Sequence, residues 1–230
     1  MHPRLLESPD SPLSGAKIWT ADVDSFSNSE VSELRTFLDP NEAARADRFR
    51  FERDQKSYVV TRGLLRVLLG ASLDEAPSDI AFQYGEHGKP AVGLPNIQFN
   101  VSHSTGWSIF AISTGPQVGI DLESAIRLKR SEDHLADLAT RILSSQELIV
   151  WRGLPTAASQ TAAFLRAWTR KEAYAKAIGH GLREEIFQLE VISDAAAPKS
   201  SVSLNISGRS WLLHDLQAPD GFAAALAIEH

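Results

Sequence analysis

The alternation of apolar and polar positions divides the first half of the chain into helices and short strands. Apolar residues recur at helical spacing over residues 29–38 and 54–69, and Asn41 is expected to cap a further helix between them. Apolar and polar residues alternate in shorter stretches, which predict strands over residues 16–22, 80–84, 97–101, 107–113 and 118–123. Glycine and proline mark residues 84–95 as a loop.

The second half repeats this layout. Helices are predicted over residues 132–143, 145–151 and 161–178, and strands over 187–192, 202–206, 211–216 and 222–228. The pattern favours an α+β fold of two similar subdomains related by a pseudo-twofold axis, each a small, mostly antiparallel sheet packed with helices. We place the subdomains at residues 16–117 and 118–230, after a flexible N-terminal tail of residues 1–15.

The composition narrows the classes of function. A net charge of −6 argues against a nucleic-acid-binding protein, since a phosphate backbone requires a basic face. The chain has no cysteine, which excludes disulfides, thiolate metal sites and a cysteine nucleophile. No apolar run approaches the ~20 residues of a membrane helix, and the N-terminal tail lacks the apolar core of a signal peptide. We therefore expect a cytoplasmic protein.

The first candidate site is a pair of acids on a predicted strand. Asp121 and Glu123 are two residues apart and so face the same side, with Ile120 and Leu122 buried behind them. Neighbouring carboxylates repel each other unless a cation lies between them, and oxygen ligands of this kind suit Mg²⁺. Mn²⁺ accepts the same ligands. The alternative is a strand end whose acids face solvent.

The second candidate site lies on the long helix predicted over residues 161–178. Glu172 and Lys176 are four residues apart and share one face of this helix. Glu172 is a candidate third metal ligand or general base, and Lys176 is a candidate phosphate contact, since both can stand beside developing phosphate charge. The alternative is a surface ion pair of small energetic value.

A third candidate site is the Ser-His-Ser sequence that ends the strand predicted over residues 97–101. Ser102 and His103 can both donate a hydrogen bond to an anion, which favours phosphate recognition. A hydrolase triad is disfavoured because no Gly-x-Ser-x-Gly elbow accompanies them. The alternative is a plain loop histidine.

Basic residues near the first helices and turns are weaker candidates. Lys89 precedes Pro90 on a stiff turn and can meet a phosphate as a point charge. Arg45 and Arg62 add positive charge from the predicted helices. The alternatives are an ordinary turn and a solvated charged face.

Taken together, four segments resemble the signature blocks of the phosphopantetheinyl transferases in their order and spacing. They are Gly88-Lys89-Pro90, FNVSHS at residues 99–104, VGIDLE at 118–123 and WTRKEAYAKAIGHGL at 168–182. The length and the two-half layout resemble the monomeric, surfactin-type branch rather than the shorter, trimeric holo-carrier synthases. A weaker match runs through residues 45–66, where Glu42 precedes it at a position that is basic in some relatives.

The resemblance implies an enzyme that transfers 4'-phosphopantetheine from coenzyme A to a serine of an acyl or peptidyl carrier protein. By this resemblance the metal ligands are Asp121, Glu123 and Glu172, and the catalytic residues are Glu172, Lys176 and Asp121. By the same resemblance the residues that bind coenzyme A are Arg45, Arg62, Lys89, Pro90, Ser102, His103 and Lys176, with Arg62 at the adenosine-phosphate end.

The resemblance also implies an acidic, helical carrier protein as partner, with no nucleic acid or membrane. Two other classes of function stay open. A Mg²⁺-dependent nucleotide phosphohydrolase could use the same carboxylates without a carrier protein. A non-catalytic protein could bind coenzyme A or a carrier protein, although binding alone does not require three converging acids.

Overall fold

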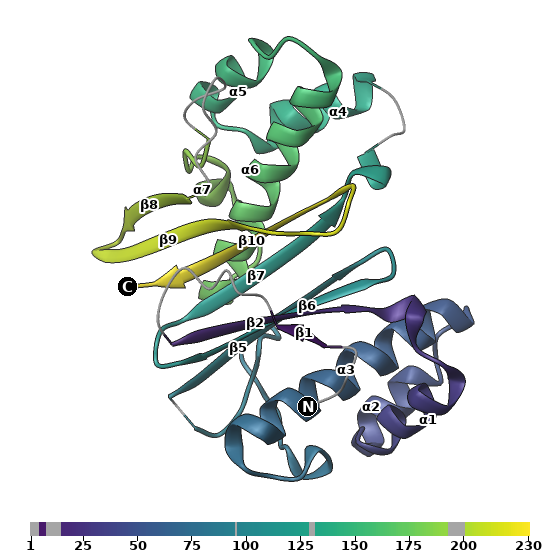
Figure 1. Cartoon of the computed structure of the whole chain (residues 1–230). Helices are drawn as coiled ribbons and strands as arrows, with labels where there is room; N and C mark the ends of the chain where they lie inside the picture. The colour runs from purple at the N-terminus through teal and green to yellow at the C-terminus, as the bar shows by residue number, and fades with distance from the viewer. Residues whose placement is uncertain (1–4, 8–14, 95, 129–131, 193–200) are drawn as a thin grey trace.

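The computed structural model describes residues 5–7, 15–94, 96–128, 132–192 and 201–230, and in it two four-stranded antiparallel sheets stack against each other (Figure 1). Helices cover the outer side of each sheet, so that helices, sheet, sheet and helices follow one another from the bottom to the top of Figure 1. The predicted α+β fold of two similar halves is confirmed. None of the described helices is long and apolar enough to cross a membrane.

The first sheet has the strand order β1-β2-β6-β5. Its strands are β1 (Leu6–Glu7), β2 (Ala16–Asp22), β5 (Ile97–Ser104) and β6 (Trp107–Thr114). The other elements of this half are η1 (Val23–Ser25), α1 (Asn28–Thr36), α2 (Pro40–Ala46), α3 (Glu52–Leu73), η2 (Pro77–Asp79) and the short hairpin of β3 (Gln83–Tyr84) and β4 (Pro90–Ala91). Within the predicted N-terminal tail, β1 pairs with β2 and Leu5 is buried.

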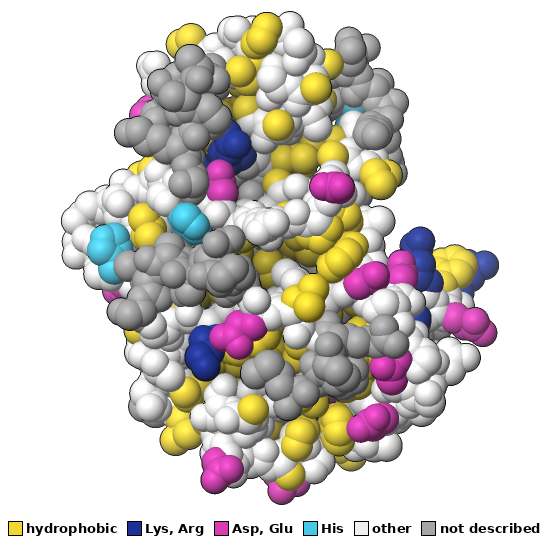
Figure 2. All heavy atoms as spheres, viewed as in Figure 1, with side chains coloured by type: hydrophobic (Ala, Val, Ile, Leu, Met, Phe, Trp, Pro, Cys, Tyr) yellow, Lys and Arg dark blue, Asp and Glu magenta, His cyan; other side chains and the backbone are white. Residues whose placement is uncertain are grey.

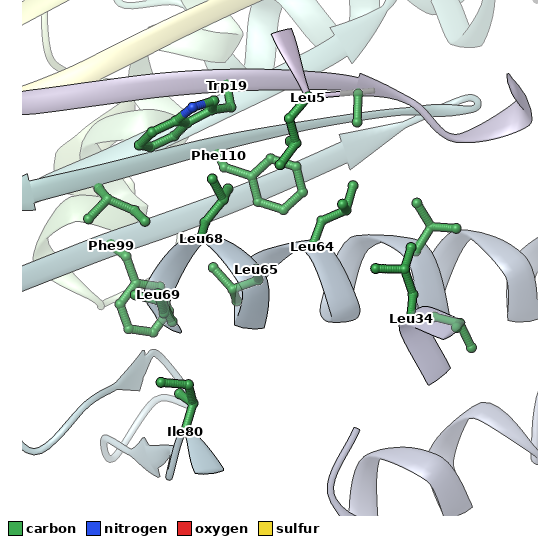
Figure 3. Close-up of a cluster of buried hydrophobic side chains, with 14 of the residues drawn as sticks. Leu5, Trp19, Leu34, Leu64, Leu65, Leu68, Leu69, Ile80, Phe99 and Phe110 are labelled. Atoms are coloured by element: carbon green, nitrogen blue, oxygen red, sulfur yellow. The ribbon is translucent and has the colours of Figure 1, made fainter. Parts of the chain in front are cut away.

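The apolar side of α3 builds the core beneath the first sheet. Four leucines spaced along this helix lie in one buried cluster with aromatic side chains of β2, β5 and β6; Leu64 and Leu68 point toward the sheet, and Leu69 lies beside Phe99 (Figure 3). These residues are Leu64, Leu65, Leu68, Leu69, Trp19, Phe99 and Phe110. The long amphipathic helix predicted from the sequence therefore anchors the strand that carries Ser102 and His103.

The second sheet has the strand order β7-β10-β9-β8. Its strands are β7 (Val118–Ser124), β8 (Ser201–Ile206), β9 (Arg209–Leu216) and β10 (Phe222–Glu229). The other elements of this half are η3 (Ala125–Leu128), α4 (Glu132–Ile142), α5 (Ser145–Arg152), α6 (Ala157–Ile178) and α7 (Glu184–Phe187). The expected boundary between residues 117 and 118 falls between β6 and β7.

The two halves share a third core, which lies between the sheets. Ile18 and Ile109 from the first sheet pack with Ile120, Leu122 and Leu226 from the second, and all five are buried. Alternation along β7 places Ile120 and Leu122 in this core and turns Asp121 and Glu123 the other way, as predicted. The site residues of the two halves are thus held in one packed unit.

The predicted strand over residues 187–192 is wrong. Its first residue ends the short helix α7, and the segment that follows is not in a sheet. The N–H groups of Val191 and Ile192 donate to the buried carboxylate of Glu147, at 2.7 and 3.1 Å. Because a side chain takes these donors, they are not available to a neighbouring strand.

Two smaller expectations also differ from the structure. The strand expected over residues 80–84 is reduced to β3, since the carbonyl of Ile80 accepts a hydrogen bond from Arg66 instead of pairing in a sheet. The cap of α2 is Asp39 rather than Asn41. Its carboxylate accepts from the N–H groups at the helix start, and Pro40 takes the first helical position, where its missing N–H costs nothing.

Candidate active site

A close approach between α6 and β7 creates the site. Gly119 on β7 has no side chain, and a Cβ placed there would stand 2.1 Å from the carbonyl oxygen of Ala173 and 2.3 Å from the nitrogen of Ala177. Only glycine allows the helix backbone to lie this near the strand. The contact sets Glu172 and Lys176, on neighbouring positions of α6, beside the carboxylates of β7.

Asp121 is the buried centre of the site, with 2 % of its surface exposed. Its Oδ1 accepts hydrogen bonds from Lys176 Nζ at 2.6 Å and from Ser102 Oγ at 3.0 Å. Lys176 also donates to Ser102 Oγ at 2.9 Å, which closes a triangle of residues from β5, β7 and α6. Oδ2 of Asp121 is buried and finds no hydrogen-bond partner in the part of the chain that the structure describes.

Polar side chains on alternate positions of β5 join this strand to β7. Asn100 accepts the N–H of Ile120 at 3.0 Å, Ser102 donates to Asp121, and Ser104 donates to Glu123 Oε2 at 3.4 Å. From the sequence we assigned no individual role to Asn100 or Ser104. The two-residue spacing in FNVSHS is the signal that points to them, because alternate residues of a strand face one side.

Glu172 is partly buried next to the two acids of β7. The pKa of Glu172 is raised to about 7, mainly by burial and also by the negative charges of Asp121 and Glu123, while the positive charge of Lys176 opposes the shift. A carboxyl group with a pKa near neutrality can exchange a proton at physiological pH. Glu172 thus has the property that a general base or acid needs.

The acids fit a divalent cation in their chemistry. The orphaned, buried oxygen of Asp121 and the mutual repulsion of three carboxylates are both relieved by a positive ion. Over the described residues, however, no three histidine or acidic side chains are gathered closely enough to hold a metal ion by themselves. Mg²⁺ does not require that, since it usually takes one or two carboxylates together with substrate phosphates and water.

Lys89 lies at the start of β7 and the end of α6 rather than at the acids. Its ammonium donates to the carbonyls of Ala177 at 2.6 Å and Val118 at 3.4 Å, and burial lowers its pKa to about 8. Pro90 follows it in β4. Lys89 therefore ties the β3–β4 hairpin to the second half of the molecule.

Arg62 belongs to a separate cluster on α3. Its guanidinium pairs with the buried Glu42, donates to the Tyr84 hydroxyl at 2.7 Å, and lies 4.0 Å from the ring centre of Phe82. Glu42 also accepts a hydrogen bond from Arg66 at 2.7 Å. Glu42, which stands at the position that the sequence analysis noted as basic in some relatives, therefore pairs with two arginines of α3.

Arg45 and His103 are both exposed. Arg45 is near the Arg62 cluster, with its guanidinium 5.3 Å from the ring centre of Tyr58. His103 follows Ser102 on β5 and turns to the other side of the strand. The structure therefore brings together Asp121, Glu123, Glu172, Lys176 and Ser102, and it distributes Arg45, Arg62 and Lys89 around them.

Comparison with known proteins places this chain in a family. A model of the 4'-phosphopantetheinyl transferase superfamily matches residues 117–227, and a model of the N-terminal part of 4'-phosphopantetheinyl transferase matches residues 25–115. The chain is 34% identical over 215 residues to the 4'-phosphopantetheinyl transferase HetI of Nostoc sp.. The matched region covers 92% of this chain and 86% of the Nostoc protein.

The chain also has more distant matches. The 4'-phosphopantetheinyl transferase psf-1 of Bacillus pumilus is 30% identical over 69% of this chain and 65% of its own length. A holo-(acyl-carrier-protein) synthase from Bacillus anthracis, solved in complex with CoA (3',5'-ADP), is 26% identical, with a TM-score of 0.36 over 49% of this chain and 94% of its own. On the strength of the family models and the long match to the Nostoc protein, the chain belongs to the 4'-phosphopantetheinyl transferase superfamily.

Proposed function

We propose that the chain transfers the 4'-phosphopantetheine of coenzyme A to a serine of an acyl or peptidyl carrier protein and releases adenosine 3',5'-bisphosphate. The observation that carries the proposal is the meeting of Asp121, Glu172 and Lys176 beside Ser102, in a chain of this family. The carrier serine oxygen forms a bond to the phosphorus next to pantetheine. The bond from that phosphorus to the bisphosphate breaks, and the serine proton leaves to a base.

Glu172 is the proposed base. Its pKa of about 7 leaves much of it ionised at neutral pH, so that it can accept the serine proton. Lys176 already neutralises one oxygen of Asp121, and we assign it a second contact to the phosphates of coenzyme A. The same ammonium is placed to screen charge that develops on the departing bisphosphate.

We assign Asp121, Glu123 and Glu172 to a Mg²⁺ ion, with Mn²⁺ as an alternative. The support is the unpartnered oxygen of Asp121 and the crowding of negative charge around Glu172. A divalent cation held there supplies neutralisation of the diphosphate charge, so that the serine oxygen can approach an anion. The carboxylates hold and orient the ion, and Ser102 and Lys176 hold Asp121 in place.

The remaining contacts to coenzyme A are proposed along the first half of the molecule. Ser102 and His103 are assigned to its phosphates. Arg45, Arg62, Lys89 and Pro90 are assigned to the adenosine end. Glu42 limits the charge that Arg62 can offer, because the two are paired. Two of the three N–H donors of the Lys89 ammonium are directed at the carbonyls of Ala177 and Val118, which leaves one for a ligand.

We further propose a monomeric, cytoplasmic enzyme of the surfactin-type branch, with subdomains at residues 16–117 and 118–230. One chain supplies both sides of the site, since Ser102 comes from the first sheet and Asp121 from the second. A second copy is therefore not needed to complete it.

The test is intact-protein mass spectrometry of an apo carrier protein incubated with the enzyme, coenzyme A and Mg²⁺. We expect a mass gain of one phosphopantetheine, which a chelator and Glu172→Gln both abolish. Bisphosphate release at the same rate without any carrier protein would support a phosphohydrolase. No gain on several types of carrier protein, with no bisphosphate released, would support a non-catalytic protein.

A further inference from the structure

The junction between α2 and α3 carries a basic-aromatic patch, defined as Arg48, Phe49, Arg50, Phe51 and Arg53. All five side chains are exposed, with 37% of the surface of Phe49 and 60% of that of Phe51 open to solvent. Residues 45–56 hold five basic and three acidic side chains, a net charge of +2 in a chain of net charge −6. Figure 2 shows Lys and Arg side chains around hydrophobic atoms at its right-hand edge, where α3 begins in Figure 1.

The arginines of the patch are not committed to strong partners. Within the part of the chain that the structure describes, the only ion pair of Arg53 is with Asp54 at 3.7 Å, and because both side chains are open to solvent it contributes little to stability. The guanidinium of Arg50 lies 5.4 Å from the ring centre of Phe51. Exposed arginine and phenylalanine are the residue types that protein interfaces favour.

A hollow of about 630 Å³ adjoins the patch between α1 and α3. Val31 and Val59 contribute apolar surface to it, and Arg53 and Lys56 contribute positive charge. A protein that binds to the patch could therefore insert a side chain or a helix edge into this recess, beside the positive charges of Arg53 and Lys56. The lining of the recess also includes Glu52 and the ion pair of Arg35 with Asp47, which disfavours a small free anion and favours a larger surface with polar groups of its own.

The patch lies at the same end of the molecule as the acids of β7. Lys56 Nζ donates to the carbonyl of Asp24 at 3.0 Å. Asp24 in turn packs against Gly106, where an added Cβ would meet its carboxylate at 2.5 Å. Gly106 is in the turn that follows Ser104, and Ser104 donates to Glu123. Two short contacts therefore connect the first turn of α3 to the hairpin at the edge of the site.

We infer that the basic-aromatic patch is a docking surface for the carrier protein, through an acidic part of the carrier's surface. This inference rests on the proposed function, which requires a protein substrate to approach Asp121 and Glu172. The enzyme as a whole is negative and repels an acidic partner, so a local positive surface next to the site steers that partner to the productive side. The phenylalanines then supply apolar contact once water is displaced.

The experiment measures steady-state transfer to an acidic apo carrier protein that the wild type modifies. Arg50→Glu and Arg48→Glu are each expected to raise the KM for the carrier about threefold to tenfold, without change in kcat or in the KM for coenzyme A. Raising the salt concentration should reduce the difference from wild type, since exposed charges are screened. Lys17→Glu is the matched control, an exposed reversal at the opposite end of β2 from Asp24, and should leave all three constants unchanged.

The outcomes separate this inference from the proposed function. If the wild type transfers phosphopantetheine but the carrier KM of Arg48→Glu and Arg50→Glu equals that of Lys17→Glu, the docking surface lies elsewhere. If the wild type transfers to no carrier, the proposed function itself fails. The same variants are tested for flotation with phosphatidylserine vesicles. A loss of wild-type flotation in them, with an unchanged carrier KM, would assign the patch to an anionic membrane surface and overturn the inference.

Discussion

The contact between Gly119 and α6 makes a quantitative prediction for Gly119→Ala. The added Cβ would lie 2.1 Å from the carbonyl oxygen of Ala173, whereas ordinary contacts begin at 3.4 Å. The obstacles are backbone atoms that cannot rotate away, so α6 must retreat from β7 by about 1.3 Å, the difference between these distances. Overpacking of this kind typically costs ~1–3 kcal/mol of stability.

The same movement carries the catalytic side chains of α6 with it. Lys176 Nζ would leave Asp121 Oδ1, now 2.6 Å away, by a similar distance, and Glu172 would move on the same helix. A misplacement of ~1 Å in an active site can cost ~10²-fold in rate. We therefore expect Gly119→Ala to fold, to unfold at lower urea concentration, and to lose about two orders of magnitude in kcat for transfer.

Gly153→Ala is the matched control for this prediction. A Cβ at Gly153 meets its nearest neighbour at 3.5 Å, and the backbone there is helical, so alanine fits. The urea midpoint and the kcat of both variants are measured on the same carrier protein. If Gly119→Ala matches Gly153→Ala in stability and in rate, α6 does not lie against β7 as described, and the origin of the site in this contact is refuted.

Four further predictions concern the charged groups. Asp121→Asn should abolish most transfer and keep a near-native urea midpoint, because the amide retains the shape but not the charge that Lys176 pairs with; near-wild-type transfer by intact mass would contradict this. The kcat of the wild type should rise with pH to a midpoint below the metal-free pKa of about 7, because a bound cation favours the ionised form of Glu172, and a kcat that does not fall as the pH is lowered would count against Glu172 as base. Since the raised pKa means that the folded chain binds this proton more tightly than the unfolded one, the metal-free wild type should lose stability between pH ~4.5 and ~7, and Glu172→Gln should lose less in thermal melts across that range. Glu147→Ala leaves Lys171 as a buried cation without its carboxylate and should cost ~3–5 kcal/mol in urea unfolding. The added change Lys171→Met should restore only part of this loss, because the N–H groups of Val191 and Ile192 still lack their acceptor; no recovery at all would show that the buried charge is not a cause.

The elements that the sequence pattern predicted well are those stabilised by their own alternation or periodicity. Strands β6, β7 and β10 and helices α3 and α6 differ from expectation by a few residues at their ends. Each of them buries a continuous apolar side in one of the three cores. For such elements the spacing of hydrophobic residues alone is sufficient to predict the type of secondary structure.

The predictions of secondary structure that are wrong concern segments whose backbone N–H and C=O groups form hydrogen bonds with buried charged side chains. Residues 187–192 alternate as a strand should, yet their N–H groups go to Glu147. The carbonyl of Phe187 goes to Lys171, which is fully buried and pairs with Glu147 at 2.5 Å. Nothing local in the sequence reveals that a lysine on one helix and a glutamate on another will meet, since the contact depends on the packing of α5 against α6.

The candidate site shows the same division. The acids of β7 and the pair on α6 followed from spacing and resemblance, and the structure brings Asp121 and Lys176 into contact. The positions of Arg62 and Lys89 did not follow, because Glu42 and the carbonyl of Ala177 compete for them in the folded chain. Such competition between a ligand and the protein's own groups is a tertiary property.

The polar side chains on alternate positions of β5 have a consequence for assembly of the chain. β7 is an outer strand of its sheet, and a bare strand edge is a template for pairing with other molecules. On this edge Asn100 accepts the backbone N–H of Ile120, and Ser102 and Ser104 bond the carboxylates of Asp121 and Glu123, so side chains of β5 take the place of another ladder of backbone hydrogen bonds. A protein cut between residues 114 and 118 would expose the edge on one fragment and lose the support of Asp121 at once. We therefore expect the isolated second fragment to aggregate through the exposed edge of β7. Mixing it with the first fragment would cover that edge again and restore activity.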